Sequence, residues 1–81
     1  MENTVYLTDE NDNRINSYPN MVGKIEGFEG DIWINVENVP KEISIQKGMY
    51  LHFGHYDLDI DGCYKVLLVA CPGKYKVERI K

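Results

Sequence analysis

The stretch Asp31-Ile32-Trp33-Ile34-Asn35-Val36-Glu37 alternates between polar and apolar residues with a period of two. This alternation predicts a β-strand with one face in the core and the other face toward solvent. Ile32, Ile34 and Val36 share the apolar face, so Trp33, the only tryptophan of the chain, falls among the polar side chains. We therefore expect Trp33 on the outer face of this strand, where it is a candidate contact residue.

Further β-prone runs flank this strand and end at turn residues. The pairs Asp61-Gly62 and Pro72-Gly73 and the residue Pro40 mark places where strands stop. The run from Cys63 to Cys71 contains Val66-Leu67-Leu68-Val69-Ala70, which is apolar on both faces and predicts a central strand covered on both sides. The expected strands are Met21 to Phe28, Ile32 to Asn38, a run that begins at Met49, Cys63 to Cys71, and Lys74 to Ile80.

These runs predict an all-β fold, a small five-stranded antiparallel barrel of the OB-like (oligonucleotide/oligosaccharide-binding) type, with an SH3-like barrel as the alternative. The whole chain, residues 1–81, is expected to form one domain. Residues 1–20, which include the short β-prone run Val5-Tyr6-Leu7, are expected to form an N-terminal arm or hairpin.

The charge is distributed unevenly along the chain. Residues 1–62 carry twelve acidic and four basic side chains, whereas residues 63–81 carry one acidic and five basic ones. No apolar run approaches the roughly 20 residues that cross a bilayer, and the start of the chain lacks the pattern of a signal peptide. We expect no membrane association and a cytoplasmic location, or an exported one if a signal peptide has been removed.

Cys63 and Cys71 are the only cysteines. If they stand at the two ends of one strand, their separation is about 27 Å at the usual rise per residue. A disulfide requires Cα atoms within about 7 Å, so we expect two free thiols, as in a reducing compartment.

Candidate metal ligands are present in two groups. Asp57, Asp59 and Asp61, followed by Gly62, match the first half of a calcium-binding loop, but Leu68 stands where the closing glutamate belongs. A solvated acidic strand end is the favoured interpretation, and whether these aspartates bind an ion is left open. The spacing of the potential zinc ligands matches no zinc module, so no cofactor is expected; these ligands are His52, His55, Cys63 and Cys71.

Catalytic residues are not evident either. Ser17 and Ser44 are the only serines, and both fall in expected loops without a nucleophile motif. No glycine-rich loop precedes a helix to hold a phosphate. We therefore expect a protein that is not an enzyme.

Exposed aromatic residues provide a binding hypothesis. If the strands at residues 32–38 and 49–53 pair as a hairpin, Trp33 lies beside Tyr50 or His52, and Tyr56 extends the row. Trp33, Tyr50, His52 and Tyr56 are the candidate binding residues. The alternative is that the N-terminal segment folds over Trp33, and the sequence leaves this open.

The middle of the chain resembles small OB-like domains found in bacterial lipoproteins. The resemblance rests on Gly27-Phe28-Glu29-Gly30-Asp31-Ile32-Trp33-Ile34, on Asn38-Val39-Pro40-Lys41-Glu42 and on Gly48-Met49-Tyr50-Leu51-His52-Phe53. It covers roughly residues 22–70 and implies the barrel fold. The lipid-attachment cysteine of those proteins is absent here.

The sequence favours a non-enzymatic module that binds a protein partner through the aromatic patch. One alternative is a small phage-type inhibitor that mimics nucleic acid with its acidic surface to block a host defence protein. Another is a weak binder of single-stranded nucleic acid, which the acidic balance of residues 1–62 opposes. The oligomeric state and the identity of the partner are left open.

Overall fold

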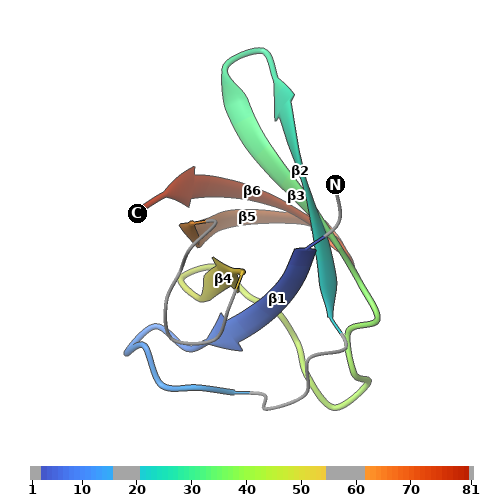
Figure 1. The fold of residues 1–81 in the computed structure, drawn as a ribbon, viewed down its shortest axis with the longest axis vertical. Helices are drawn as coiled ribbons and strands as arrows, with labels where there is room; N and C mark the ends of the chain where they lie inside the picture. Colours follow the sequence, from blue (N-terminus) through green and yellow to red (C-terminus); the bar gives the residue numbers. More distant parts are fainter. Residues whose placement is uncertain (1–2, 16–20, 55–61, 81) are drawn as a thin grey trace.

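The chain folds into a closed antiparallel barrel of six strands (Figure 1). The computed structural model describes residues 3–15, 21–54 and 62–80, without the side chains of Asn3 and Phe28. The strand order around the barrel is β1-β2-β3-β6-β5-β4, and no helix occurs in the described ranges. The strands are β1 (Asn3–Thr8), β2 (Val22–Phe28), β3 (Asp31–Glu37), β4 (Tyr50–Phe53), β5 (Cys63–Cys71) and β6 (Lys74–Arg79).

The predicted antiparallel barrel is confirmed, but it has one strand more than expected. The additional strand is β1, which belongs to the segment expected to be an arm. It pairs with β4 over residues 5–8 and with β2 at residues 3 and 4, and so closes the barrel. Val5 and Leu7 are fully buried. The apolar pattern of β1 is too short for the sequence alone to distinguish a barrel strand from an arm.

The expected hairpin between residues 32–38 and 49–53 is wrong. The structure pairs β3 with β2 and β6, whereas β4 pairs with β1 and β5. In the order of the barrel, β3 and β4 are therefore on opposite sides. The connector between β3 and β4 is too long for a tight turn, and its residue Ile45 packs in the core. The chain therefore enters β4 next to β1 and β5 and not next to β3.

Two tight turns join the strands that do form hairpins. Glu29 and Gly30 connect β2 to β3 with φ values of 51° and 86°, as a type I′ turn requires at its two central positions. Pro72 and Gly73 connect β5 to β6, and Gly73 has a φ of 94°. Figure 1 shows the β2–β3 hairpin projecting from the top of the barrel.

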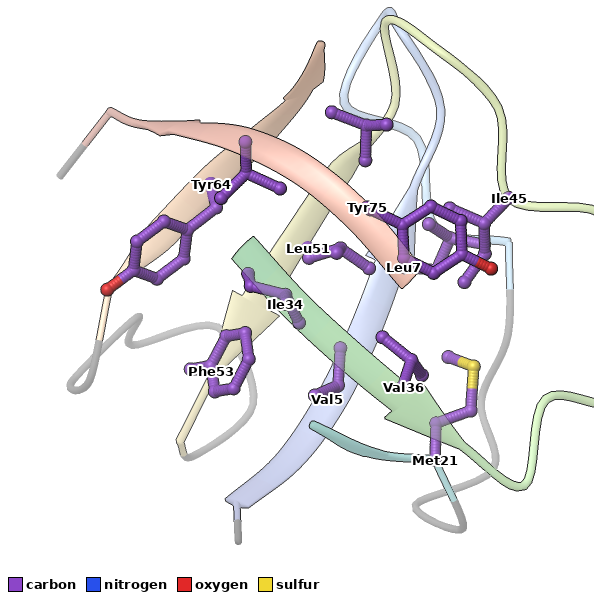
Figure 2. Close-up of a cluster of buried hydrophobic side chains, with 12 residues drawn as sticks. Val5, Leu7, Met21, Ile34, Val36, Ile45, Leu51, Phe53, Tyr64 and Tyr75 are labelled. Atoms are coloured by element: carbon purple, nitrogen blue, oxygen red, sulfur yellow. The ribbon is translucent and has the colours of Figure 1, made fainter. Parts of the chain in front are cut away.

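The interior of the barrel holds a single apolar cluster (Figure 2). Ile34 and Val36 point into it, whereas Trp33, of the opposite parity on β3, is half-buried. The alternation expected for this strand is thus confirmed. The ring of Phe53 meets the ring of Tyr64 edge-on at 5.5 Å between centroids. The cluster comprises Val5, Leu7, Met21, Ile34, Val36, Ile45, Leu51, Phe53, Tyr64, Val66, Tyr75 and Val77.

The expectation that β5 is covered on both faces is wrong for its second half. β4 pairs with β5 only as far as Lys65, and β-bulges shift the register with β6 between Val66 and Leu68 and again between Val69 and Cys71. Leu68 is 51% exposed and Val69 is 38% exposed. Among the described residues, no strand pairs with β5 on that side beyond Lys65, and Leu68 and Val69 lie exposed at this end of the barrel.

Candidate functional site

The outer surface of β2, β3, β6 and β5 carries two rows of side chains that run across the strands. In the first row, Glu26 is opposite Trp33, Trp33 is opposite Lys76, and Lys76 is opposite Leu68. In the second row, Asn35 lies between Lys24 and Lys74. We call this surface the Trp33 face, defined by Lys24, Glu26, Trp33, Asn35, Leu68, Lys74 and Lys76.

Trp33 has one cation beside its ring and lies between residues of β2 and β6 on this face. The Nζ atom of Lys74 lies 5.5 Å from the centroid of the Trp33 ring, within the range of a cation–π interaction. The cross-strand neighbours of Trp33 are Glu26 and Lys76. The indole is half-buried, so part of its surface remains accessible to a partner.

The lysines of the Trp33 face differ in their ion pairing. Nζ of Lys76 lies 3.5 Å from Oδ2 of Asp31. Within the described ranges, Lys24 and Lys74 make no ion pair. A hollow of about 290 Å³ opens beside Lys24, lined by Val22, Gly23, Lys24, Glu26, Asn35 and Glu37.

The described part of the N-terminal segment does not pair with β3. Residues 3 and 4 of β1 pair with Gly23 and Val22 of β2, whereas Trp33 is opposite Glu26, toward the other end of that strand. Val5 and Leu7 point into the core rather than over the Trp33 face.

Tyr50 and His52, the other predicted binding residues, lie on β4 on the opposite side of the barrel. Their ring centroids are 6.5 Å apart, so the structure brings these two together but separates them from Trp33. Tyr56 lies outside the described residues. A hollow of about 340 Å³ adjoins the pair, lined by Glu10, Asn11, Asp12, Tyr50, His52, Cys63 and Ile80.

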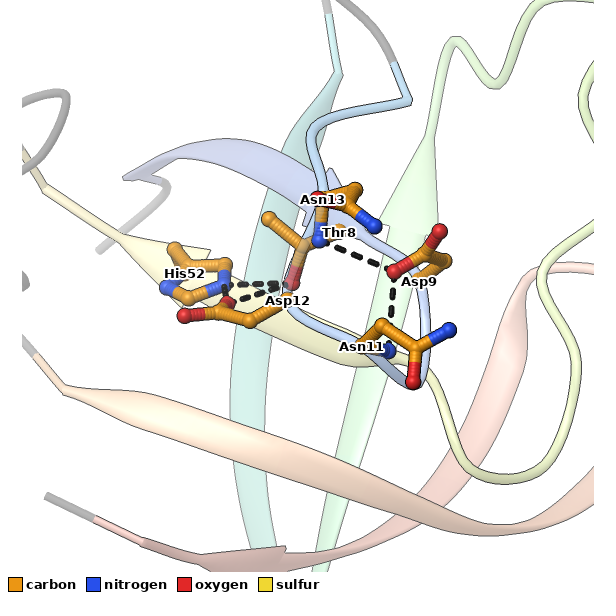
Figure 3. Close-up of polar contacts among 6 residues, drawn as sticks. All are labelled: Thr8, Asp9, Asn11, Asp12, Asn13 and His52. Carbon is orange, nitrogen blue, oxygen red and sulfur yellow. Dashed lines mark hydrogen bonds and ion pairs between the residues drawn. The ribbon is translucent and has the colours of Figure 1, made fainter.

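His52 is tied to the loop that follows β1 (Figure 3). The Nε2 atom of His52 lies 2.8 Å from Oγ1 of Thr8 and 3.4 Å from Oδ1 of Asp12. The Thr8 hydroxyl donates to the same Asp12 oxygen at 3.1 Å. These contacts are mutually consistent when Nε2 carries a hydrogen, because the hydroxyl oxygen then accepts from the ring and donates to the carboxylate. They serve to fix the loop on β4.

Asp9 organises the same loop from within. Its Oδ1 accepts hydrogen bonds from the backbone N–H of Asn13 at 2.8 Å and of Asn11 at 2.9 Å. The bond from Asn13 is the main reason that the pKa of Asp9 is lowered, because it favours the charged carboxylate.

A third hollow, of about 330 Å³, lies between the connector and the β5–β6 hairpin. It is lined by Val36, Val39, Ile43, Ser44, Ile45, Val69, Pro72, Gly73 and Tyr75. The Tyr75 hydroxyl accepts a hydrogen bond from the N–H of Gly73 at 3.0 Å, which holds the hairpin turn against this hollow.

Cys63 and Cys71 stand at the two ends of β5, as expected, with Cys63 buried and Cys71 exposed. The candidate calcium ligands Asp57, Asp59 and Asp61 and the candidate zinc ligand His55 lie outside the described residues. Among residues 3–15, 21–54 and 62–80, no three His, Cys, Asp or Glu side chains are grouped closely enough to hold a metal ion.

The sequence does not predict that Lys24, Asn35, Lys74 and Leu68 lie on the same face as Trp33. The basic character of residues 74–81 is visible in the sequence, but their register against β3 is not.

No helix in the described part of the chain is long and apolar enough to span a membrane.

Comparison with protein-family models, with curated proteins and with solved structures finds no match for this chain. The chain is a small all-β barrel, and Trp33 stands among both lysine and glutamate side chains on its outer face.

Proposed function

We propose that this protein is a non-enzymatic interaction module that binds a protein partner through the Trp33 face. The observation that carries the proposal is the half-buried Trp33 in the same cross-strand row as Leu68, which is 51% exposed. Tryptophan is enriched among the residues that dominate binding energy at protein interfaces. Exposed apolar side chains grouped on one face of a soluble protein commonly mark such an interface.

The proposal changes the composition of the predicted patch. Tyr50 and His52 do not belong to the Trp33 face, because β4 is on the other side of the barrel. We include the OB-like relationship in the proposal, since OB barrels bind ligands on the face of their second and third strands, and β3 carries Trp33. The rigid pairing of β3 with β2 and β6 favours binding without a large loss of conformational entropy.

Binding of single-stranded nucleic acid is the second candidate. Bases stack on exposed aromatic rings that stand next to cations, and Lys74 lies over the ring of Trp33. The acidic residues Glu26 and Glu37 border the same surface and weaken its attraction for phosphates. The phage-type inhibitor hypothesis requires an acidic contact surface, which the Trp33 face is not, and it stays a prediction.

An affinity pull-down tests the proposal. The wild-type protein, a Trp33→Ala variant and a Tyr50→Ala variant are immobilised and exposed to a lysate of the source organism. Tyr50→Ala is the matched control because it removes a half-buried aromatic side chain from the opposite side of the barrel. We expect Trp33→Ala to lose a partner that the other two retain. Equal recovery by all three proteins would exclude the Trp33 face as the binding surface.

A further inference from the structure

The second cross-strand row of the Trp33 face places an amide between two cations. Asn35 of β3 is opposite Lys24 of β2 on one side and Lys74 of β6 on the other. Neighbouring strands are about 4.8 Å apart, so the two lysine backbones stand about 10 Å apart with Asn35 between them. This spacing lets the two flexible side chains converge on one group bound over Asn35.

Charge pairing on this surface leaves these two lysines available. The nearest lysine along β6, Lys76, is paired with Asp31 at 3.5 Å. Within the described residues, Lys24 and Lys74 have no carboxylate within ion-pair distance. Lys74 instead lies over the Trp33 ring, so a carboxylate that binds Lys74 is held close to the indole.

We infer that the partner contributes an extended acidic peptide segment, with one carboxylate between Lys24 and Lys74 and a neighbouring apolar side chain against Trp33 and Leu68. This inference rests on the proposed function and specifies the chemistry of the partner. The carboxylate takes charge-assisted hydrogen bonds from the lysines, and the Asn35 amide can donate a third. The hollow of about 290 Å³ beside Lys24 is also lined by Glu26 and Glu37, so the carboxylate belongs over Asn35, between the two lysines, and not in this hollow.

The acidic residues on the same surface favour a peptide over a nucleic acid. Glu26 and Glu37 line the hollow, and Asp31 lies at the end of β3 that is nearer to Trp33. A phosphate backbone carries a charge at every nucleotide and meets these carboxylates wherever it crosses the face. A peptide can place one carboxylate at the lysines and uncharged side chains elsewhere.

Trp33 is the only tryptophan, so its intrinsic fluorescence reports directly on this site. The probe is a blocked synthetic peptide of alternating glutamate and leucine, titrated at low ionic strength and again with added salt. The control peptide has glutamine at every glutamate position, and an oligothymidylate of similar length represents nucleic acid. We expect saturable, salt-sensitive quenching or enhancement with the glutamate peptide alone.

Charge-removing variants identify the cations involved. Lys24→Gln and Lys74→Gln should each weaken binding of the glutamate peptide by up to about fivefold, the range of an exposed ion pair. Lys41→Gln and Lys47→Gln are the matched controls, because both are exposed lysines of the connector between β3 and β4. These controls should bind as the wild type does.

Each contrary result has a defined meaning. Equal binding of the glutamate and glutamine peptides, or no response to either, overturns acidic recognition. Tighter binding of the oligothymidylate overturns the peptide in favour of nucleic acid. In these cases a partner lost in the Trp33→Ala pull-down still supports the proposed function, whereas no loss there removes the basis of both proposals.

Discussion

Gly23 of β2 lies directly against the ring of Phe53 from β4, across the interior of the barrel. A Cβ atom at residue 23 would be 2.6 Å from Cζ of Phe53 and would also overlap the side chain of Val5. Both neighbours are almost fully buried, so neither can move without disturbing the core. The absence of a side chain at residue 23 is therefore a packing requirement of the barrel.

Gly23→Ala is expected to lower the free energy of unfolding by about 1–3 kcal/mol, the usual cost of overpacking a core. Urea denaturation followed by circular dichroism measures this change. Gly27→Ala in the same strand is the matched control, because nothing lies within 4 Å of a Cβ at residue 27. It should leave stability unchanged or raise it by about 0.4–1 kcal/mol. Equal losses in both variants would contradict the packing argument.

Adjacent residues of β3 should respond differently to truncation. Ile34 is fully buried whereas Trp33 is half-buried on the outer face. We expect Ile34→Ala to cost about 2–5 kcal/mol, as for other buried aliphatic residues, and Trp33→Ala to cost less despite the larger side chain removed. The two midpoints of urea denaturation provide the comparison. A greater loss for Trp33→Ala would mean that the indole belongs to the core.

Proline should cost less stability at Ile25 of β2 than at the next residue, Glu26. The N–H of Val5 donates to the carbonyl of Met21, and backbone groups in an antiparallel strand alternate in direction. The N–H of Ile25 therefore points to the side of β2 that faces β1, beyond the described β1–β2 pairs, and that of Glu26 points to β3.

Ile25→Pro should accordingly lose less stability than Glu26→Pro, because no strand pairs with β2 at Ile25 on that side within the described residues, and proline is tolerated at an unpaired strand edge. Glu26→Pro should be much less stable, since it removes a hydrogen bond of the β2–β3 ladder. Circular dichroism and the urea midpoint of each variant measure the difference. Similar losses for both prolines would contradict the assigned strand direction.

The pKa of Asp9 should lie below its ordinary value of 3.8 in the folded protein, because the N–H groups of Asn13 and Asn11 stabilise the carboxylate. A group whose pKa is lowered on folding stabilises the native state above its unfolded pKa. That contribution is lost as the pH falls through 3.8 toward the folded pKa. Titration of the Asp9 carboxyl carbon by NMR measures the pKa directly.

Asp9→Asn is the control for this titration, because the amide retains an acceptor oxygen but cannot ionise. The stability advantage of the wild type over this variant should be largest above about pH 4 and should shrink in more acidic solution. A difference that is independent of pH, or an Asp9 pKa at or above 3.8, would show that the loop does not favour the ionised carboxylate.

The candidate site was predictable in part. The alternation of residues 31–37 placed Trp33 outside the core, and that of residues 49–53 placed Tyr50 and His52 on an outer surface, as the structure has them. Their grouping into one patch was wrong. Sequence proximity of two strands favours a hairpin, but the 38–49 connector carries the chain to the far side of the barrel.

Local sequence patterns predict five of the six strands, the turn residues of the β2–β3 and β5–β6 hairpins and the inward or outward direction of side chains on β3. These features depend on the pleat of a strand and on the backbone freedom of residues such as Gly30 and Gly73, which are local properties. The closure of the barrel by β1, the exposure of Leu68 beside a bulge and the position of Asn35 between Lys24 and Lys74 are visible only in the folded chain. Those features depend on which distant strands become neighbours and in which register, and the combined burial of the whole core selects that arrangement.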